Sequence, residues 1–309
     1  MIDFTMFAQI FWTGAATSAY YVLFTIAFAL VLKVVKLWNF AQGGFMGVAF
    51  YAMFFAFNGL HFPIWAGLAF GIAFTVVFAG LVEVLCLRTL RTRRSSSLTF
   101  FIFTLILSEF IAYLLMLFFG TEPVTLFPSI LSPVRVVANI AISDWDLVAL
   151  SSTGALSLAL WVFLRFHREG QFLTAVADNG PLAELYGISA KRAYLVAMTI
   201  AGVFVCAGMY LFGTRAGVIP TTPLELLLFA VIATLLGGIG RIFSAALAAI
   251  VIGLVQSFSV LVIASAWQNL VLYGFLFFTI LVFPRGFRLP GLRRVRGADL
   301  APQPTAESV

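Results

Sequence analysis

The sequence has little charge and few residues that could build a metal site or a disulfide. Of 309 residues, only 10% are charged, two are cysteine and two are histidine. A soluble domain usually carries about 25% charged residues, so this composition excludes a soluble globular enzyme and a charged disordered chain. Cys86 and Cys206 both lie within apolar runs, and two such residues support neither a disulfide framework nor a metal centre.

Motifs for nucleotide or metal chemistry are also missing. The sequence contains no G-x-x-x-x-G-K-[ST] for ATP phosphates, no H-E-x-x-H, and no recurring Ser, His and Asp set. We therefore expect no enzymatic activity, no catalytic residue, no metal and no cofactor. A protein of this kind that moves a solute must take its energy from another component.

Apolar residues dominate what is present. They make up 62% of the chain, 35 of them are Phe, and the mean hydropathy is +1.10. This predicts an all-α polytopic integral membrane protein embedded in the lipid bilayer, with about 8–9 transmembrane helices, some short or broken. The membrane domain would occupy residues 1–297, and the polar stretch 298–309 would be a disordered tail.

Nine apolar segments are candidate spans. Seven are clear candidates: 11–32, 63–87, 98–119, 147–166, 193–213, 242–263 and 269–283. Two are short, 43–57 and 224–236, and each adjoins a glycine-rich turn.

Basic residues identify the cytoplasmic side. Fifteen of the eighteen Lys and Arg residues can be placed on one side of the membrane, and they are Lys33, Lys36, Arg88, Arg91, Arg93, Arg94, Arg165, Arg168, Lys191, Arg192, Arg285, Arg288, Arg293, Arg294 and Arg296. Because basic loops stay in the cytoplasm, the N-terminus is expected outside and the C-terminus inside. The basic charge thus reflects membrane topology, and we expect no nucleic-acid partner.

The longest inner loop, residues 168–193, has the pattern of a docking element. Pro181 suits the first position of a helix and Gly187 suits its end. A short helix of about 181–186 would display Leu182, Glu184 and Leu185. It would either dock into a groove on a partner or rest on lipid headgroups.

The glycine-rich turns beside the two short segments are candidate parts of a pathway. The residues concerned are Asn39, Gln42, Gly43 and Gly44 at the first turn, and Gly237, Gly238 and Gly240 at the second. Interrupted helices can expose backbone groups to a substrate. Small residues spaced four apart, such as Gly43 and Gly47 or Ala245 and Ala249, favour close helix packing as the explanation of any single glycine.

Glu109 lies deep within the apolar segment 98–119. A charged side chain at the bilayer centre costs about 2.5–3.5 kcal/mol on insertion scales, so this residue should face a cavity or a partner. Thr104 and Ser108 would extend it into one polar patch. The alternative is a hydrogen bond between helices that serves assembly only.

Three stretches together resemble the permeases of branched-chain amino acid ABC transporters. LWNFAQGGFMGVAFY at 37–51 is similar to that family's N-F-A-H-G motif, with Gln42 where His is common. FLTAVADNGPLAELYGISAKRA at 172–193 is similar to its cytoplasmic loop, with Thr174 in place of Arg. LLGGIGRIFSAALAAIVIGL at 235–254 is similar to its G-G-x-G-[ST] motif, with Arg241 in place of the hydroxyl residue. The resemblance covers residues 7–290.

The resemblance implies a permease subunit in a bacterial inner membrane without an ATPase of its own. Its partners would be a second related permease, two cytoplasmic ABC ATPases and a periplasmic binding protein. The ATPase-coupling residues would be Asp178, Leu182, Glu184, Leu185 and Gly187. The pathway residues would be Asn39, Gln42, Gly43, Glu109, Gly237, Gly238 and Gly240.

Other functions stay open from the sequence. Permeases of the same superfamily also serve urea, amides and aromatic carboxylates. An ion-driven secondary carrier would have the same hydropathy and would use Glu109 as its cation site. A membrane scaffold subunit would have no pathway at all.

Overall fold

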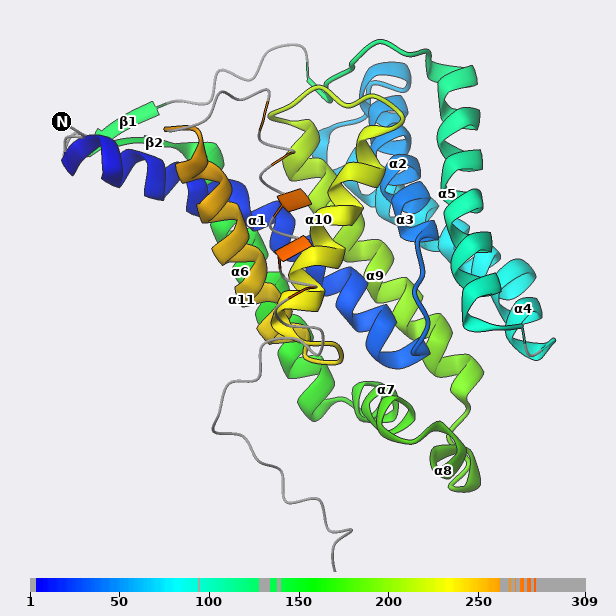
Figure 1. Ribbon diagram of the computed structural model, residues 1–309. Helices are drawn as coiled ribbons and strands as arrows, with labels where there is room; N and C mark the ends of the chain where they lie inside the picture. Colours follow the sequence, from blue (N-terminus) through cyan, green and yellow to red (C-terminus); the bar gives the residue numbers. More distant parts are fainter. Residues whose placement is uncertain are drawn as a thin grey trace, which may run out of the picture.

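The protein is a bundle of apolar helices with a small β-hairpin at one end (Figure 1). The computed structural model describes residues 4–93, 95–127, 134–137 and 140–261, with a few further residues between 267 and 281. The predicted tail 298–309 and most of the predicted span 269–283 lie outside the described residues.

Six helical runs in the described part of the chain are long and apolar enough to cross a bilayer. They are α1 (Phe4–Val35), α3 (Ile64–Val82) with its continuation, α5 (Ser97–Phe119), α6 (Asp144–Phe166), α9 (Ala190–Gly213) and α11 (Ile242–Ser259). The continuation of α3 is a π-helical turn, η2 (Glu83–Leu87), followed by α4 (Arg88–Thr92). All six runs overlap predicted spans, so the all-α membrane architecture is confirmed.

The two short predicted spans are also helical. The first is α2 (Ala41–Phe54), which ends in a π-helical turn, η1 (Phe55–Gly59), and the second is α10 (Thr222–Gly237). Every residue of α2 from Ala41 to Met53 is buried. A helix that is apolar and buried all round belongs inside a bundle, so these short helices are internal elements.

Burial separates central helices from peripheral ones. In α1, 89% of the most apolar window is buried, whereas the corresponding share is 22% in α5 and 17% in α6. The outward faces of α5 and α6 carry large apolar side chains, among them Phe110, Leu117 and Leu158. Such faces are suited to contact with lipid or with another membrane subunit.

Small residues allow the inner helices to approach closely. A Cβ on Gly43 would meet the Ser108 hydroxyl of α5, and one on Gly47 would meet Leu115. On α11, Ala245 and Ala249 are fully buried. The packing interpretation of the small-residue spacing is therefore confirmed at these positions.

A two-stranded hairpin was not predicted from the apolar pattern. Strands β1 (Val134–Val137) and β2 (Ile140–Ser143) pair antiparallel, with Val134 opposite Ser143. Gln9 of α1 holds the hairpin, because its side chain donates to the Ala141 carbonyl at 3.1 Å and accepts from the Ala141 N–H at 2.7 Å. The hairpin and the start of α1 lie at the upper end of the bundle (Figure 1).

The opposite end carries two further helices. These are α7 (Arg168–Asp178) and α8 (Gly180–Leu185), which lie below the bundle near the C-terminal end of α1 (Figure 1). The expected single helix at 181–186 is thus present one residue earlier. The preceding helix α7 was missed, although Val176 and Ala177 follow Leu173 by three and four residues and all three are buried.

Candidate functional site

The helix α8 is capped at both ends although most of its side chains are exposed. Asn179 caps its start by accepting from the Leu182 N–H at 3.1 Å. At its end, Gly187 has φ +80°, and the Gly187 and Ile188 N–H groups donate to the carbonyls of Glu184 and Ala183 at 3.0 Å. This is a Schellman-type ending, in which glycine takes the left-handed position.

The outward side chains of α8 form an apolar surface with one charge. Leu182 is 48% exposed and Leu185 is 84% exposed, and Glu184 is exposed beside them. Tyr186, which follows the helix, is also exposed. We call Leu182, Glu184, Leu185 and Tyr186 the α8 surface. Apolar side chains displayed on a capped, rigid helix are the features of a docking element.

The helix α7 connects the α8 surface to the bundle. A Cβ on Gly170 would overlap the carbonyl oxygen of Phe163, so only glycine allows α7 to turn this closely under α6. Glu169 forms an ion pair with Arg192 of α9 at 2.5 Å. Through these contacts α7 and α8 are tied to both α6 and α9.

The predicted residues of the first turn are buried in the protein. The Asn39 side chain accepts from the Ala41 N–H at 3.2 Å, which fixes the start of α2. Gln42 is fully buried and donates to the Ala27 carbonyl at 3.3 Å. Gln42 Oε1 is buried without a hydrogen-bond partner among the described residues. Both side chains, like Gly43, therefore lie at helix–helix contacts within this chain.

The second turn joins α10 to α11 and depends on glycine. Gly238 and Gly240 have φ values of +92° and +87°, which L-residues rarely adopt. A Cβ on Gly237 would overlap the backbone of Ala245. The structure therefore explains all three glycines by backbone geometry and close packing.

The predicted patch of Thr104, Ser108 and Glu109 is divided by the structure, and the expectation of one patch was wrong. Thr104 and Ser108 are buried against the α1–α2 connection, where the Thr104 hydroxyl accepts from the Phe40 N–H at 3.1 Å. Glu109 is half-buried and lies next to the outward-facing Phe110. No hydrogen bond or ion pair links Glu109 to another residue in the described part of the chain.

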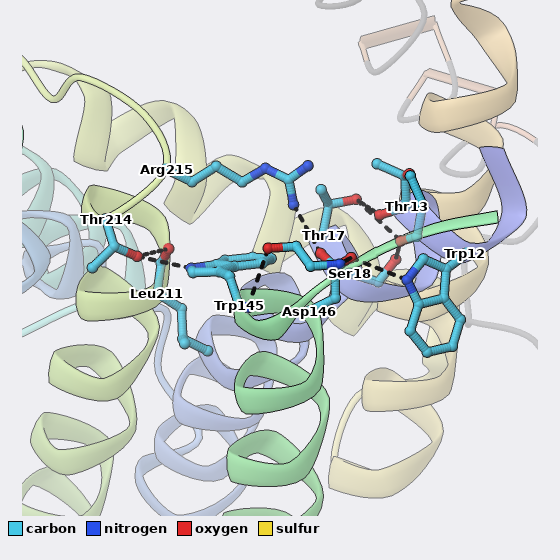
Figure 2. A network of polar contacts seen from close by, with 12 residues as sticks. Trp12, Thr13, Thr17, Ser18, Trp145, Asp146, Leu211, Thr214 and Arg215 are labelled. Carbon is cyan, nitrogen blue, oxygen red and sulfur yellow. Dashed lines mark hydrogen bonds and ion pairs between the residues drawn. The ribbon is translucent and has the colours of Figure 1, made fainter. Parts of the chain in front are cut away.

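A polar network that the sequence reading missed lies at the upper end (Figure 2). Asp146 is 4% exposed. Its carboxylate accepts from the indole N–H of Trp12 at 3.0 Å and the Ser143 N–H at 3.1 Å, and it forms an ion pair with Arg215 at 3.4 Å. This network joins α1, the start of α6 and the loop after α9.

Arg215 and Trp145 complete the network. The Arg215 guanidinium lies 4.7 Å from the centre of the Trp145 ring, and the indole N–H of Trp145 donates to the Thr214 hydroxyl at 2.9 Å. The Ser143–Asp146 spacing is that of a helix capping box, a signal that could have identified Asp146 from the sequence.

Comparison with known proteins agrees with this architecture. A family model described as the permease component of branched-chain amino acid transport systems matches residues 10–281. The chain therefore belongs to this family of membrane permeases.

Several curated relatives are similar over nearly their whole length. The high-affinity branched-chain amino acid transport system permease protein LivH of Escherichia coli K12 is 26% identical, over 92% of this chain and 96% of that protein. LivH of Salmonella typhimurium is 25% identical over the same shares. The corresponding permease protein BraD of Pseudomonas aeruginosa is 23% identical, over 88% of this chain and 92% of its own.

Proposed function

We propose that this chain is the membrane-spanning permease subunit of an ATP-driven importer for branched-chain amino acids or a related small amino acid or carboxylate. The observation that carries the proposal is the rigid, exposed α8 surface on a chain that belongs to this permease family. The chain would work with a second permease, two cytoplasmic ATPases and a periplasmic binding protein.

The α8 surface is the proposed contact with the ATPase. Leu182 and Leu185 would enter an apolar groove on the ATPase, and Glu184 would orient the contact through its charge. The Gly187 turn and the Asn179 cap keep α8 in one shape. Because α7 is tied to α6 and α9, a displacement of α8 would move these long helices.

Asp178 is proposed as a coupling residue at the junction of α7 and α8. It is the last residue of α7 and is exposed directly before the α8 cap. Because Asp178 and Asn179 join the two helices, their backbone would transmit a displacement of α8 to α7.

The pathway is proposed to run along the outward face of α5, between this chain and the second permease. Glu109 is the polar group on that face that would reach the pathway, because lipid alone disfavours a carboxylate at this depth. Asn39, Gln42 and Gly43 would set the position of α2, which packs against the inner side of α5. Gly237, Gly238 and Gly240 would shape the turn below α10.

The topology is proposed to include nine crossings of the inner membrane of a bacterium. The N-terminus would lie in the periplasm and the C-terminus in the cytoplasm, so that α7 and α8 face the ATPases. The concentration of Lys and Arg at the α7–α8 end supports this orientation.

Reconstituted transport tests the proposal. Proteoliposomes would contain this chain, the second permease and the ATPases, with the binding protein outside and ATP inside. Uptake of labelled leucine that requires both ATP and the binding protein is the expected result. Uptake of urea, an amide or an aromatic carboxylate in place of leucine would reassign the substrate. A complex that assembles but transports nothing would favour the scaffold alternative.

A further inference from the structure

A groove of about 450 Å³ lies at the α7–α8 end of the bundle, apart from the outward face of α5. Four segments meet there: the C-terminal end of α1, the connection from α1 to α2, the last turn of α7 and the turn after α10. The lining residues are Leu32, Lys33, Lys36, Trp38, Ala177, Asp178, Ile239 and Gly240.

Charges of both signs line this groove. Lys33 is half-buried in it, and Lys36 and Asp178 are exposed at its edge. The Lys36 ammonium donates to the backbone carbonyl of Asp178 at 3.4 Å. Within the described ranges, neither the Lys33 ammonium nor the Asp178 carboxylate has an ion-pair partner. The groove thus presents two ammonium groups and one carboxylate to whatever enters it.

The backbone that shapes the groove is fixed by a helix end and a glycine turn. Lys36 has φ 60° directly after α1, and Gly240 has φ +87° on the opposite wall. Lys36 takes the left-handed position that commonly ends a helix, and its N–H donates to the Leu32 carbonyl at 2.9 Å. In the connection between α1 and α2, the Thr104 hydroxyl of α5 accepts from the Phe40 N–H at 3.1 Å and lies 3.4 Å from the Trp38 carbonyl.

The rest of the lining is apolar. Leu32, Trp38 and Ile239 provide aliphatic and aromatic surface next to the charged groups. A free α-amino acid with an apolar side chain has the matching features: a carboxylate for the lysines, an ammonium for Asp178 and a side chain for the apolar wall.

We infer that this groove is a binding site for a free zwitterionic α-amino acid on the α7–α8 side of the membrane. The groove is lined by the end of α7, next to the proposed ATPase contact, and by the turn after α10, so it would hold an amino acid that has reached the inner side. The choice of leucine as the probe rests on the proposed function. The requirement that the ligand carry both a carboxylate and an ammonium group rests on the charges that line the groove.

Calorimetric titration of the purified full-length chain in lipid nanodiscs tests this inference. L-leucine would be titrated alongside L-leucinamide, which lacks the carboxylate, and 4-methylpentanoate, which lacks the ammonium. Each analogue loses one charge-assisted contact, so each should bind about tenfold more weakly than leucine.

Substitutions of the charged groove residues test whether leucine binds in the groove. Lys33→Met and Asp178→Asn should each weaken leucine binding about tenfold. The control is Lys191→Met, because Lys191 is exposed and outside the groove, and it should bind as the parent protein does. Thermal unfolding in the same nanodiscs checks that each variant is folded.

Three results would overturn the inference. These are equal binding of 4-methylpentanoate and leucine, unchanged leucine binding in both groove variants, and no leucine binding by the folded parent protein. The titration uses neither the ATPase nor the binding protein. A chain that supports ATP-driven leucine uptake yet fails the titration would refute the groove assignment and leave the proposed function in place.

Discussion

The two ends of the bundle use polar and apolar residues in opposite ways. At the upper end, Asp146 is buried and satisfied by Trp12, Ser143 and Arg215 from separate segments of the chain (Figure 2). At the lower end, Leu185 is 84% exposed at the tip of a capped helix.

The difference indicates which end of the bundle has its polar and apolar groups satisfied by this chain alone. The upper network satisfies its own donors and acceptors, so its main effect is to hold α1, α6 and the loop after α9 together. The α8 surface leaves apolar area uncovered on a helix that is capped at both ends. Stability is therefore expected to depend on the upper end, and activity on the lower end.

The largest effect should come from Leu185→Asp. A charge at the centre of an apolar docking contact should weaken ATPase association by about 2 kcal/mol, or roughly thirtyfold. Co-purification with the ATPase and ATP-driven uptake measure the loss. Because Leu185 is exposed, insertion and thermal stability should stay unchanged.

Thr92→Asp is the matched control for Leu185→Asp. Thr92 is exposed on α4, outside the α8 surface. Its replacement by Asp adds the same charge as Leu185→Asp does. Normal ATPase binding is expected for this control. If Leu185→Asp also kept its ATPase and its transport rate, the coupling role of α8 would be wrong.

The upper end is tested by comparing two neighbouring aspartates. Asp146→Asn removes a buried charge that accepts from three groups, and it should lower the free energy of unfolding by about 1–3 kcal/mol. Asp144→Asn should change it by less than about 0.5 kcal/mol, because its ion-pair partner Arg135 is 74% exposed. Thermal unfolding in detergent compares them, and equal losses would contradict a structural role for the network.

Gly187→Ala should destabilise the end of α8 by less than Asp146→Asn destabilises the whole protein. Alanine at φ +80° costs roughly 1 kcal/mol relative to glycine. The end of α8 should fray and expose more backbone to hydrogen exchange. Gly154→Ala is the control, because a Cβ at this position on α6 meets open space. Equal exchange at 182–188 in both variants would count against the capped geometry.

Glu169→Gln should have the smallest effect. Its partner Arg192 is 68% exposed, and exposed ion pairs contribute about 0–1 kcal/mol. We expect a thermal unfolding midpoint within a few degrees of that of the parent protein. A large loss of stability would mean that the lower end, too, is held by its polar contacts.

The sequence predicted the helices better than the polar contacts. Runs such as 98–119 are long and apolar, and lipid requires each such run to satisfy its own backbone, so α5 was found within one residue at its start. Pro181 and Gly187 identified α8 because their preferences are local. The ranges 269–283 and 298–309 stay predictions.

The polar sites depend on distant segments, and the sequence alone did not bring these together. The bond between Trp12 and Asp146 joins residues 134 positions apart. Thr104 and Ser108 are buried on the inner side of α5, whereas Glu109 is half-buried, a difference that single-residue polarity does not reveal. The roles of Asn39, Gln42 and Glu109 in a pathway stay predictions.

The source of energy for uptake tests the central claim most directly. Leucine uptake would be measured in two sets of proteoliposomes, one with this chain alone under an imposed proton or sodium gradient, and one with the assembled complex, the binding protein and ATP. The account predicts no concentrative uptake by the chain alone and ATP-dependent uptake by the complex. Gradient-driven accumulation by the chain alone would contradict it and identify an ion-driven carrier.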